Sequence, residues 1–125
     1  MVKTKIGGRE FALLFNVEAM DELEAILEIS IDLTNLQEAL IGRLRDRHDL
    51  VHVFYVLARQ GEYEMGREPD FDEQWLKRRM RPGNQLQLHA KVVEAIADGL
   101  KMEHEGAKDE EVDVVLAELK KKPTK

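Results

Sequence analysis

Residues 6–24 read IGGREFALLFNVEAMDELE, and this stretch decides how the fold begins. The pair Gly7-Gly8 can supply the positive φ angles of a two-residue hairpin turn, and residues 2–15 alternate between polar and apolar around it. We therefore predict a short β-hairpin within residues 2–15. Because an isolated hairpin is marginal in water, its apolar face must lie against helices or against another subunit. That face carries Phe11, Leu13 and Phe15.

A first helix is predicted directly after the hairpin. Asn16 has the position and chemistry of a helix N-cap, and the following apolar residues recur at helical spacing as far as about Ile29. Seven acidic residues and no Lys or Arg lie between Phe11 and Gly42, so one face of the early helices is expected to be acidic and solvated. The residues expected on the apolar face are Val17, Met20, Leu23, Ile26 and Leu27.

Two further helices are predicted before the main loop. Thr34 and Gln37 have the spacing of a capping box, which indicates a short second helix. The segment from Leu50 to Ala58 is apolar on most sides, which is typical of a helix surrounded by neighbours, and we expect it to end at Gly61. This segment is predicted to be the centre of the core.

Residues 61–70 contain two glycines, a proline and mixed charge, and they are predicted to form a loop. Asp70 or Asp72 then caps a helix that contains Trp75 and stops at Pro82-Gly83. Asn84 is predicted to cap the next and longest helix. Its expected apolar face carries Leu86, Val93, Ile96, Ala97 and Leu100, widened by Leu88 and Val92.

The residues after Gly106 are predicted to form a separate element. Asp109 can cap a last amphipathic helix, with acidic residues in its first turn and Lys120, Lys121 and Lys122 in its last, as the helix dipole favours. Two hypotheses stand for its apolar stripe: it folds back onto its own core, or it docks on another chain. The stripe carries Val112, Val115, Leu116 and Leu119.

These patterns predict a mainly α protein in which a short N-terminal β-hairpin packs on a bundle of about five to six helices. We expect residues 1–105 to form one helical domain, followed by an amphipathic helix and a lysine-rich tail in residues 106–125. A chain of 125 residues is long enough for one core of this kind.

Charge and composition exclude several classes of function. The net charge is −6, which disfavours general binding to a phosphate backbone. The absence of cysteine excludes disulfides, a thiolate nucleophile and Cys-ligated metal sites. No signal peptide or membrane span is expected, and the cytosol is the simplest compartment. We predict no enzyme activity and no cofactor.

His48 and His52 are four residues apart, a spacing with which a helix can offer two imidazoles to zinc. However, the stretch reads HDLVH, with Asp49 where the metalloprotease motif requires Glu, and no third ligand follows at motif spacing. We therefore interpret both as polar residues on a helix and predict no metal site.

Lys77, Arg78, Arg79 and Arg81 form a basic cluster beside Trp75. Such a mixture of cations and an aromatic ring can bind nucleic acid. Because the protein as a whole is acidic, two other interpretations of this cluster are favoured. The cations form a solvated face, or they contact an acidic region such as residues 18–28 of a neighbouring subunit. Nucleic-acid binding through residues 77–81 is kept as the alternative.

The opening stretch resembles the start of the tail assembly chaperones of long-tailed bacteriophages and prophages. In that family a strand, a glycine turn and an alternating aromatic and apolar strand lead into a helix with an Ala-Met-x-x-Leu-Glu signature. Here the signature is Ala19, Met20, Leu23 and Glu24. The stretch PDFDEQWL at residues 69–76 is similar to a helix start found late in such proteins.

The resemblance implies a non-enzymatic protein of the host cytoplasm that coats the tape measure protein and recruits tail tube subunits. It also implies a homo-oligomer, and a longer form made by ribosomal frameshifting, for which adenine-rich codons at Lys120, Lys121 and Lys122 would be suited. The residues predicted to contact a partner or another copy are Phe11, Leu13, Phe15, Trp75, Val112, Val115, Leu116 and Leu119.

Overall fold

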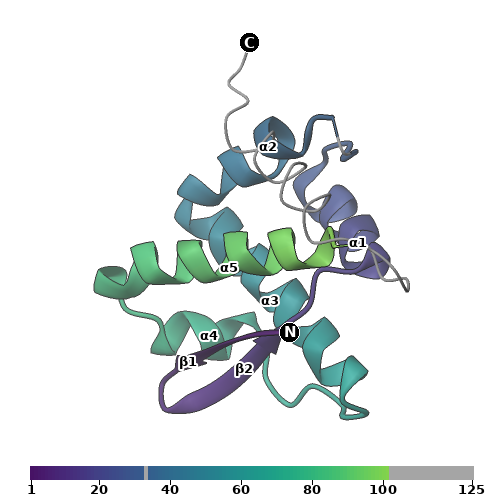
Figure 1. The fold of residues 1–125 in the computed structure, drawn as a ribbon. Helices are drawn as coiled ribbons and strands as arrows, with labels where there is room; N and C mark the ends of the chain where they lie inside the picture. The colour runs from purple at the N-terminus through teal and green to yellow at the C-terminus, as the bar shows by residue number, and fades with distance from the viewer. Residues whose placement is uncertain (33, 102–125) are drawn as a thin grey trace.

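The computed structural model describes residues 1–32 and 34–101, and it is mainly helical (Figure 1). A two-stranded antiparallel hairpin precedes the helices and packs against them, so the predicted fold class is confirmed. The described elements, in chain order, are β1 (Val2–Ile6), β2 (Arg9–Leu13), α1 (Val17–Leu27), α2 (Leu36–Ala39), the 3₁₀ segment η1 (Ile41–Arg45), α3 (Arg47–Glu64), α4 (Glu73–Arg79), the 3₁₀ segment η2 (Pro82–Asn84) and α5 (Gln85–Gly99).

The hairpin turns at the predicted glycine pair. Gly7 and Gly8 have φ angles of 58° and 81°, which side chains other than glycine tolerate poorly. The register pairs Val2 with Leu13 and Ile6 with Arg9. One face of the hairpin is therefore apolar, as the alternation predicts.

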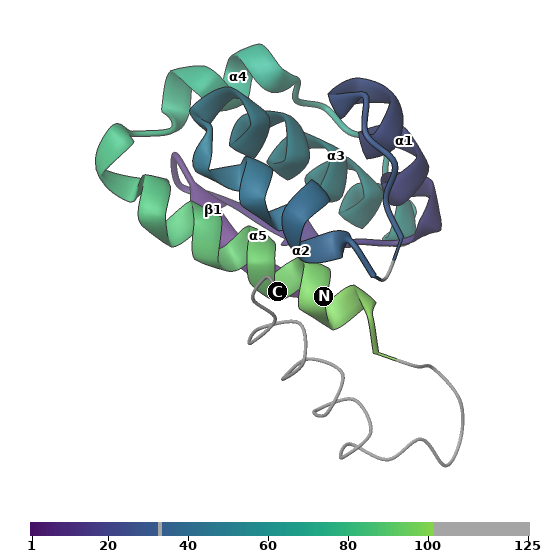
Figure 2. The ribbon, with the colours of Figure 1, turned by 90° about the horizontal axis from the view of Figure 1, so that it is seen from above.

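Helix α3 is the centre of the fold. It contacts β2, α1, α4 and α5, and Figure 2 shows these elements arranged around it. The buried residues of α3, from Val51 on one side through Phe54 to Val56 on the other, cover more than half of the circumference of the helix. Helix α3 must therefore have neighbours on most sides. The prediction that this segment forms the core is confirmed.

The two strands of the hairpin rest on different helices. β2 packs on α3, and β1 lies beside α5. The backbone N–H of Leu14 donates a hydrogen bond of 3.1 Å to the carbonyl oxygen of Leu57, which ties the end of β2 to α3. The apolar face of the hairpin is thus covered by the protein's own helices.

Helix α1 begins at the predicted cap, because the Asn16 side chain accepts a hydrogen bond from the N–H of Ala19 at 2.9 Å. It ends at Leu27, earlier than predicted, where Glu28 adopts a left-handed conformation with φ 56°. Val17 is 71% exposed and Ile26 is 40% exposed, so these two residues do not belong to the buried face.

The predicted capping box at Thr34 is wrong. The backbone N–H and the hydroxyl of Thr34 both donate to the Asp32 carboxylate, at 2.8 and 2.6 Å, which makes a local turn instead of a helix start. The short helix α2 begins two residues later, at Leu36, and leads through η1 to Asp46.

The helix end predicted at Gly61 is also wrong, since α3 continues to Glu64. Gly61 is buried against the backbone of β2, and the absence of a side chain permits that close approach. The loop therefore begins after Glu64. Arg67 closes it back onto the helix with two hydrogen bonds to the buried carboxylate of Glu62, at 3.0 and 3.1 Å.

Asp72 caps α4 as predicted, by accepting a hydrogen bond of 2.8 Å from the N–H of Trp75. The Asn84 side chain makes no capping bond to α5, which is preceded by the 3₁₀ turn η2. The predicted face of α5 is wrong at Leu86, which is 81% exposed. The buried residues of α5 are Leu88, Val92, Ala95 and Ile96.

The predicted C-terminal helix, with Val112, Val115, Leu116 and Leu119, lies outside the described residues. Among the helices that the structure does describe, none combines the length and the apolar character required to cross a bilayer.

Candidate partner-binding site

A cavity of about 350 Å³ opens where the start of α3, the end of α4 and the start of α5 meet. Its floor is apolar, while cationic side chains and one histidine surround it. We call it the basic pocket. The floor carries Leu50, Val51, Met80 and Leu88, and the rim carries Arg47, His48, Lys77 and Arg81.

Local sequence explains how the first turn of α3 reaches the pocket. The Asp46 carboxylate accepts hydrogen bonds from the N–H groups of His48 and Asp49, at 2.8 and 3.1 Å. These hydrogen bonds, chiefly the one from the N–H of Asp49, lower the pKa of the Asp46 carboxyl below its usual range. The cap fixes the start of α3, and so places Arg47 and His48 on the rim.

The other two sides of the pocket come from the connection between α4 and α5. Lys77 and Met80 lie at the C-terminal end of α4, where the helix dipole favours a cation. Pro82 then starts the turn η2, so that Leu88 of α5 reaches the floor. Arg81 stands on the connection itself.

Positive charge extends beyond this pocket. A neighbouring cavity of about 260 Å³ is lined by Lys5, Arg79 and Arg81, and another of about 460 Å³ is lined by Arg45. No described Asp or Glu lines any of these three cavities. In a chain with a net charge of −6, this end of the molecule is therefore locally basic.

A cluster of aromatic residues joins α4 to strand β2 of the hairpin. The ring of Phe11 makes edge-to-face contacts with Phe71 and Trp75, at centroid distances of 5.0 and 5.9 Å. The Arg9 guanidinium packs over the same rings and pairs with Asp70. This cluster fixes the position of α4, and with it Lys77.

The side chains of the predicted basic cluster have three different surroundings. Lys77 and Arg81 line the basic pocket. The Arg79 guanidinium stacks 4.4 Å from the ring centre of Trp75, while Arg78 is exposed. The cations of residues 77–81 therefore do not form a single row.

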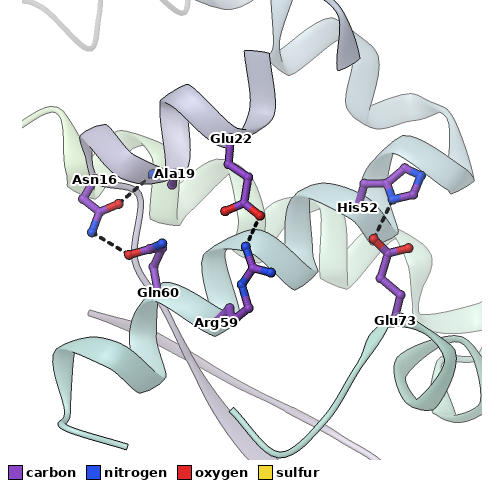
Figure 3. A network of polar contacts seen from close by, with 7 residues as sticks. All are labelled: Asn16, Ala19, Glu22, His52, Arg59, Gln60 and Glu73. Carbon is purple, nitrogen blue, oxygen red and sulfur yellow. Dashed lines mark hydrogen bonds and ion pairs between the residues drawn. The ribbon is translucent and has the colours of Figure 1, made fainter. Parts of the chain in front are cut away.

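Figure 3 shows the polar contacts that hold α3 against α1 and α4. The Asn16 amide donates to Gln60 at 3.1 Å, and Glu22 of α1 pairs with Arg59 of α3. Glu22 is thus held in an ion pair, contrary to the solvated acidic face expected from the sequence.

The two histidines have different surroundings. His52 Nδ1 lies 2.7 Å from the Glu73 carboxylate of α4 (Figure 3), whereas His48 is exposed at the rim of the basic pocket. Within residues 1–32 and 34–101, no three His, Asp or Glu side chains are grouped as a metal ion would require.

A second depression lies at the opposite end of α5. Its volume is about 900 Å³, and its lining mixes apolar and polar residues. The exposed Val17 of α1 contributes to it, and its charged side chains are Glu64, Asp98 and Lys101, the last two of which form an ion pair. Figures 1 and 2 both place α1 away from the junction of α4 and α5, so the two ends differ in charge.

Of the predicted contact residues, the hairpin aromatics Phe11 and Phe15 and the neighbouring Leu13 are buried in the protein's own core. The folded monomer therefore does not expose them to a partner. Trp75 is partly buried against Phe11 and stacks with Arg79, and it does not line the basic pocket. The other four lie outside the described residues.

Sequence reasoning missed the contribution of α3 to this site. Arg47 of α3 lines the basic pocket, and Arg45 of η1 lines a neighbouring cavity. Both lie about thirty residues before the basic cluster, and no periodicity joins the two segments. The local signal was Asp46, whose capping chemistry marks a helix start between two arginines. Comparison with known proteins adds no relative, since no family model, curated protein or solved structure matches this chain.

Proposed function

We propose that this protein is a tail assembly chaperone of a long-tailed phage, which binds the tape measure protein and recruits tail tube subunits in the host cytoplasm. The observation that carries the proposal is the resemblance of residues 6–24 to the start of that family. In the fold, these residues form most of the hairpin and most of α1.

The basic pocket supplies a binding surface suited to this role. Its apolar floor can bury the side chains of a client helix, and its rim can pair with acidic residues beside them. One such pocket binds a client weakly, whereas many copies along a long helical client bind with a higher effective concentration. No catalytic group is required for this mechanism.

The first test is co-expression with a phage tape measure protein. We expect the pair to co-purify as a soluble complex, and the substitution Lys77→Glu together with Arg81→Glu to reduce the yield of complex at least about tenfold. The matched control is Lys3→Glu together with Lys91→Glu, which changes the net charge equally at positions outside the pocket.

Genomic context gives an independent test. A tail tube gene upstream and a very long helical protein downstream would support the proposal. Neighbouring genes unrelated to tails, together with no co-purification, would contradict it.

The alternative is a nucleic-acid-binding regulator. The observation that favours it is the positive charge of the basic pocket and of the two neighbouring cavities. Cations from three parts of the fold line these cavities, and no described Asp or Glu does. The apolar floor and the net charge of −6 favour a protein partner instead. A gel shift over a series of salt concentrations separates the two functions, because phosphate contacts produce a steep loss of affinity with salt.

A further inference from the structure

The basic pocket combines an apolar floor with positive charge that no described acid balances. Arg47, Lys77 and Arg81 stand on its rim, and no Asp or Glu lines it. Within the described part of the chain, none of these three cations forms an ion pair with a carboxylate. A complementary ligand therefore carries several carboxylates beside apolar side chains.

One segment of this chain has that composition. Residues 109–119 read DEEVDVVLAEL, with five acidic residues and no basic residue, and the lysines follow only after Leu119. At helical spacing, acids lie along both edges of the apolar stripe, so carboxylates can meet cations on either side of an apolar floor. The acids on one edge are Asp109 and Asp113, and those on the other are Glu111 and Glu118.

The chain is long enough for this segment to reach the pocket of its own copy. The described residues end at Lys101, just beyond α5. Leu88 of the pocket floor lies on that helix thirteen positions earlier, which corresponds to about 20 Å along the helix axis. The eleven residues from 102 to 112 span up to about 36 Å when extended, so Val112 can return to the pocket without strain.

The depression at the other end of α5 is nearer to Lys101, but its charges cancel. Its acidic residues are Glu64 and Asp98. Lys101, which pairs with Asp98 at 3.5 Å, and the amino group of Met1 balance them. An acidic segment therefore gains no net attraction there, whereas it does at the basic pocket. The shorter connection favours the depression only weakly, because the entropy of loop closure changes slowly with loop length.

We infer that residues 109–119 fold back onto the basic pocket of their own chain, with the apolar stripe on the floor and the acids against the rim. The segment then occupies the surface proposed above for the client, and a client must displace it. Because the segment is tethered, its effective concentration at the pocket is high, so the apolar floor stays covered until a client competes. The contact is independent of the client, whereas its inhibitory role rests on the proposed function.

Cross-linking within single chains tests the contact. The chain has no cysteine of its own, so His48→Cys at the pocket rim and Ala117→Cys, off the stripe, give one defined pair for a bismaleimide reagent. The comparison pair uses Val17→Cys in place of His48→Cys, because Val17 is exposed in the depression. We expect the rim pair to cross-link within monomers at least about tenfold faster, although the depression is nearer to Lys101.

Charge substitutions in the rim pair test the electrostatic part of the contact. Lys77→Glu with Arg81→Glu should slow the cross-linking at least about tenfold. Lys3→Glu with Lys91→Glu changes the net charge equally outside the pocket and should not slow it. Circular dichroism checks that each protein is folded, and Arg47→Glu, on a different element, replaces the pocket variant if that one is not.

A fluorescein-labelled peptide of residues 107–122 is the probe for the inhibitory role. Full-length protein with Val112→Asp and Leu116→Asp should bind this peptide at least about tenfold more tightly than the wild type does, because its own segment no longer occupies the pocket. Val114→Asp is the matched control. Val114 lies off the stripe at helical spacing, so this variant should bind the peptide as weakly as the wild type.

Three results would overturn the inference. Faster cross-linking of the Val17 pair would place the segment in the depression, and products of dimer mass would place it on another copy. Equal binding of the peptide by the wild type and by the stripe variant would show that the pocket is open. Neither measurement uses a tape measure protein, so a failure to co-purify with one would count against the proposed function only.

Discussion

Gly61 packs so closely against β2 that a Cβ atom at position 61 would lie 1.9 Å from the carbonyl oxygen of Ala12. The neighbouring backbone is itself fixed, because Leu14 donates its N–H to the carbonyl oxygen of Leu57, one helical turn before Gly61. The helix and the strand therefore cannot separate at this point without breaking main-chain contacts.

The substitution Gly61→Ala should destabilise the protein by about 3 kcal/mol, because the added methyl group displaces backbone and not a flexible side chain. In an ordinary helix the same change would stabilise by about 0.5–1 kcal/mol. Urea unfolding followed by circular dichroism measures the difference. Gly83→Ala, where a Cβ would meet nothing within 4 Å, is the control and should change stability by less than about 0.5 kcal/mol.

The ion pair between Glu22 and Arg59 should show a coupling of about 1 kcal/mol, because its side chains are only 29% and 20% exposed. A double-mutant cycle with Glu22→Gln and Arg59→Met measures this coupling. The more exposed pair Lys91 and Glu94, at 3.7 Å, serves as control and should give no more than about 0.3 kcal/mol. Equal couplings would show that the α1–α3 pair adds no specific stability.

Asn16 both caps α1 and donates to Gln60, so Asn16→Ala should cost about 1–2 kcal/mol. Asn16→Asp should cost less than half of that, because a carboxylate still caps the helix and can accept a bond from Gln60 Nε2, which has no hydrogen-bond partner within the described part of the chain. Asn84→Ala is the matched control, since the Asn84 side chain makes no capping bond. Thermal unfolding ranks the stabilities of the three variants. Similar losses of stability in Asn16→Ala and Asn84→Ala would contradict the assignment of Asn16 as the helix cap.

Stability should fall in acid partly through Asp46. Hydrogen bonding, chiefly from the N–H of Asp49, lowers the pKa of this carboxyl in the folded state below its ordinary value of 3.8. A lowered folded-state pKa stabilises the protein above the unfolded-state pKa, and this stabilisation is lost as pH falls below about 4. Asp46→Asn keeps a capping side chain but does not titrate, so its stability difference from the wild type should shrink between about pH 7 and pH 3. A difference independent of pH would contradict this prediction.

Local signals predicted the parts of the fold that local chemistry determines. Gly7-Gly8 forms the turn, and Asn16 and Asp72 cap their helices, because each choice involves residues within four positions. The predictions were wrong where a contact with a residue distant in the sequence determined the structural role of a residue. Gly61 was interpreted as a helix end because glycine usually ends helices, but here it admits the backbone of Ala12.

The candidate site was predictable only in part, for the same reason. The cluster at residues 77–81 could be recognised in the sequence. The different surroundings of its cations could not, since the stacking of Arg79 on Trp75 depends on tertiary packing. Leu86 was assigned to the core because it matched the helical period, yet it lies on the solvent side of α5. Periodicity identifies an apolar face but does not show where the face ends.

The pairing of β1 with α5 has a consequence for how the protein is made. The first strand begins at Val2 and rests on a helix that ends at Gly99. A ribosome must therefore deliver nearly the whole described chain before β1 is covered, and until then its apolar residues Val2 and Ile6 remain accessible to other chains, although β2 can already pack on α3. Newly made copies that are close together, as on one messenger, would meet at this stage, so the rate of synthesis and the supply of general chaperones should influence the yield of folded protein.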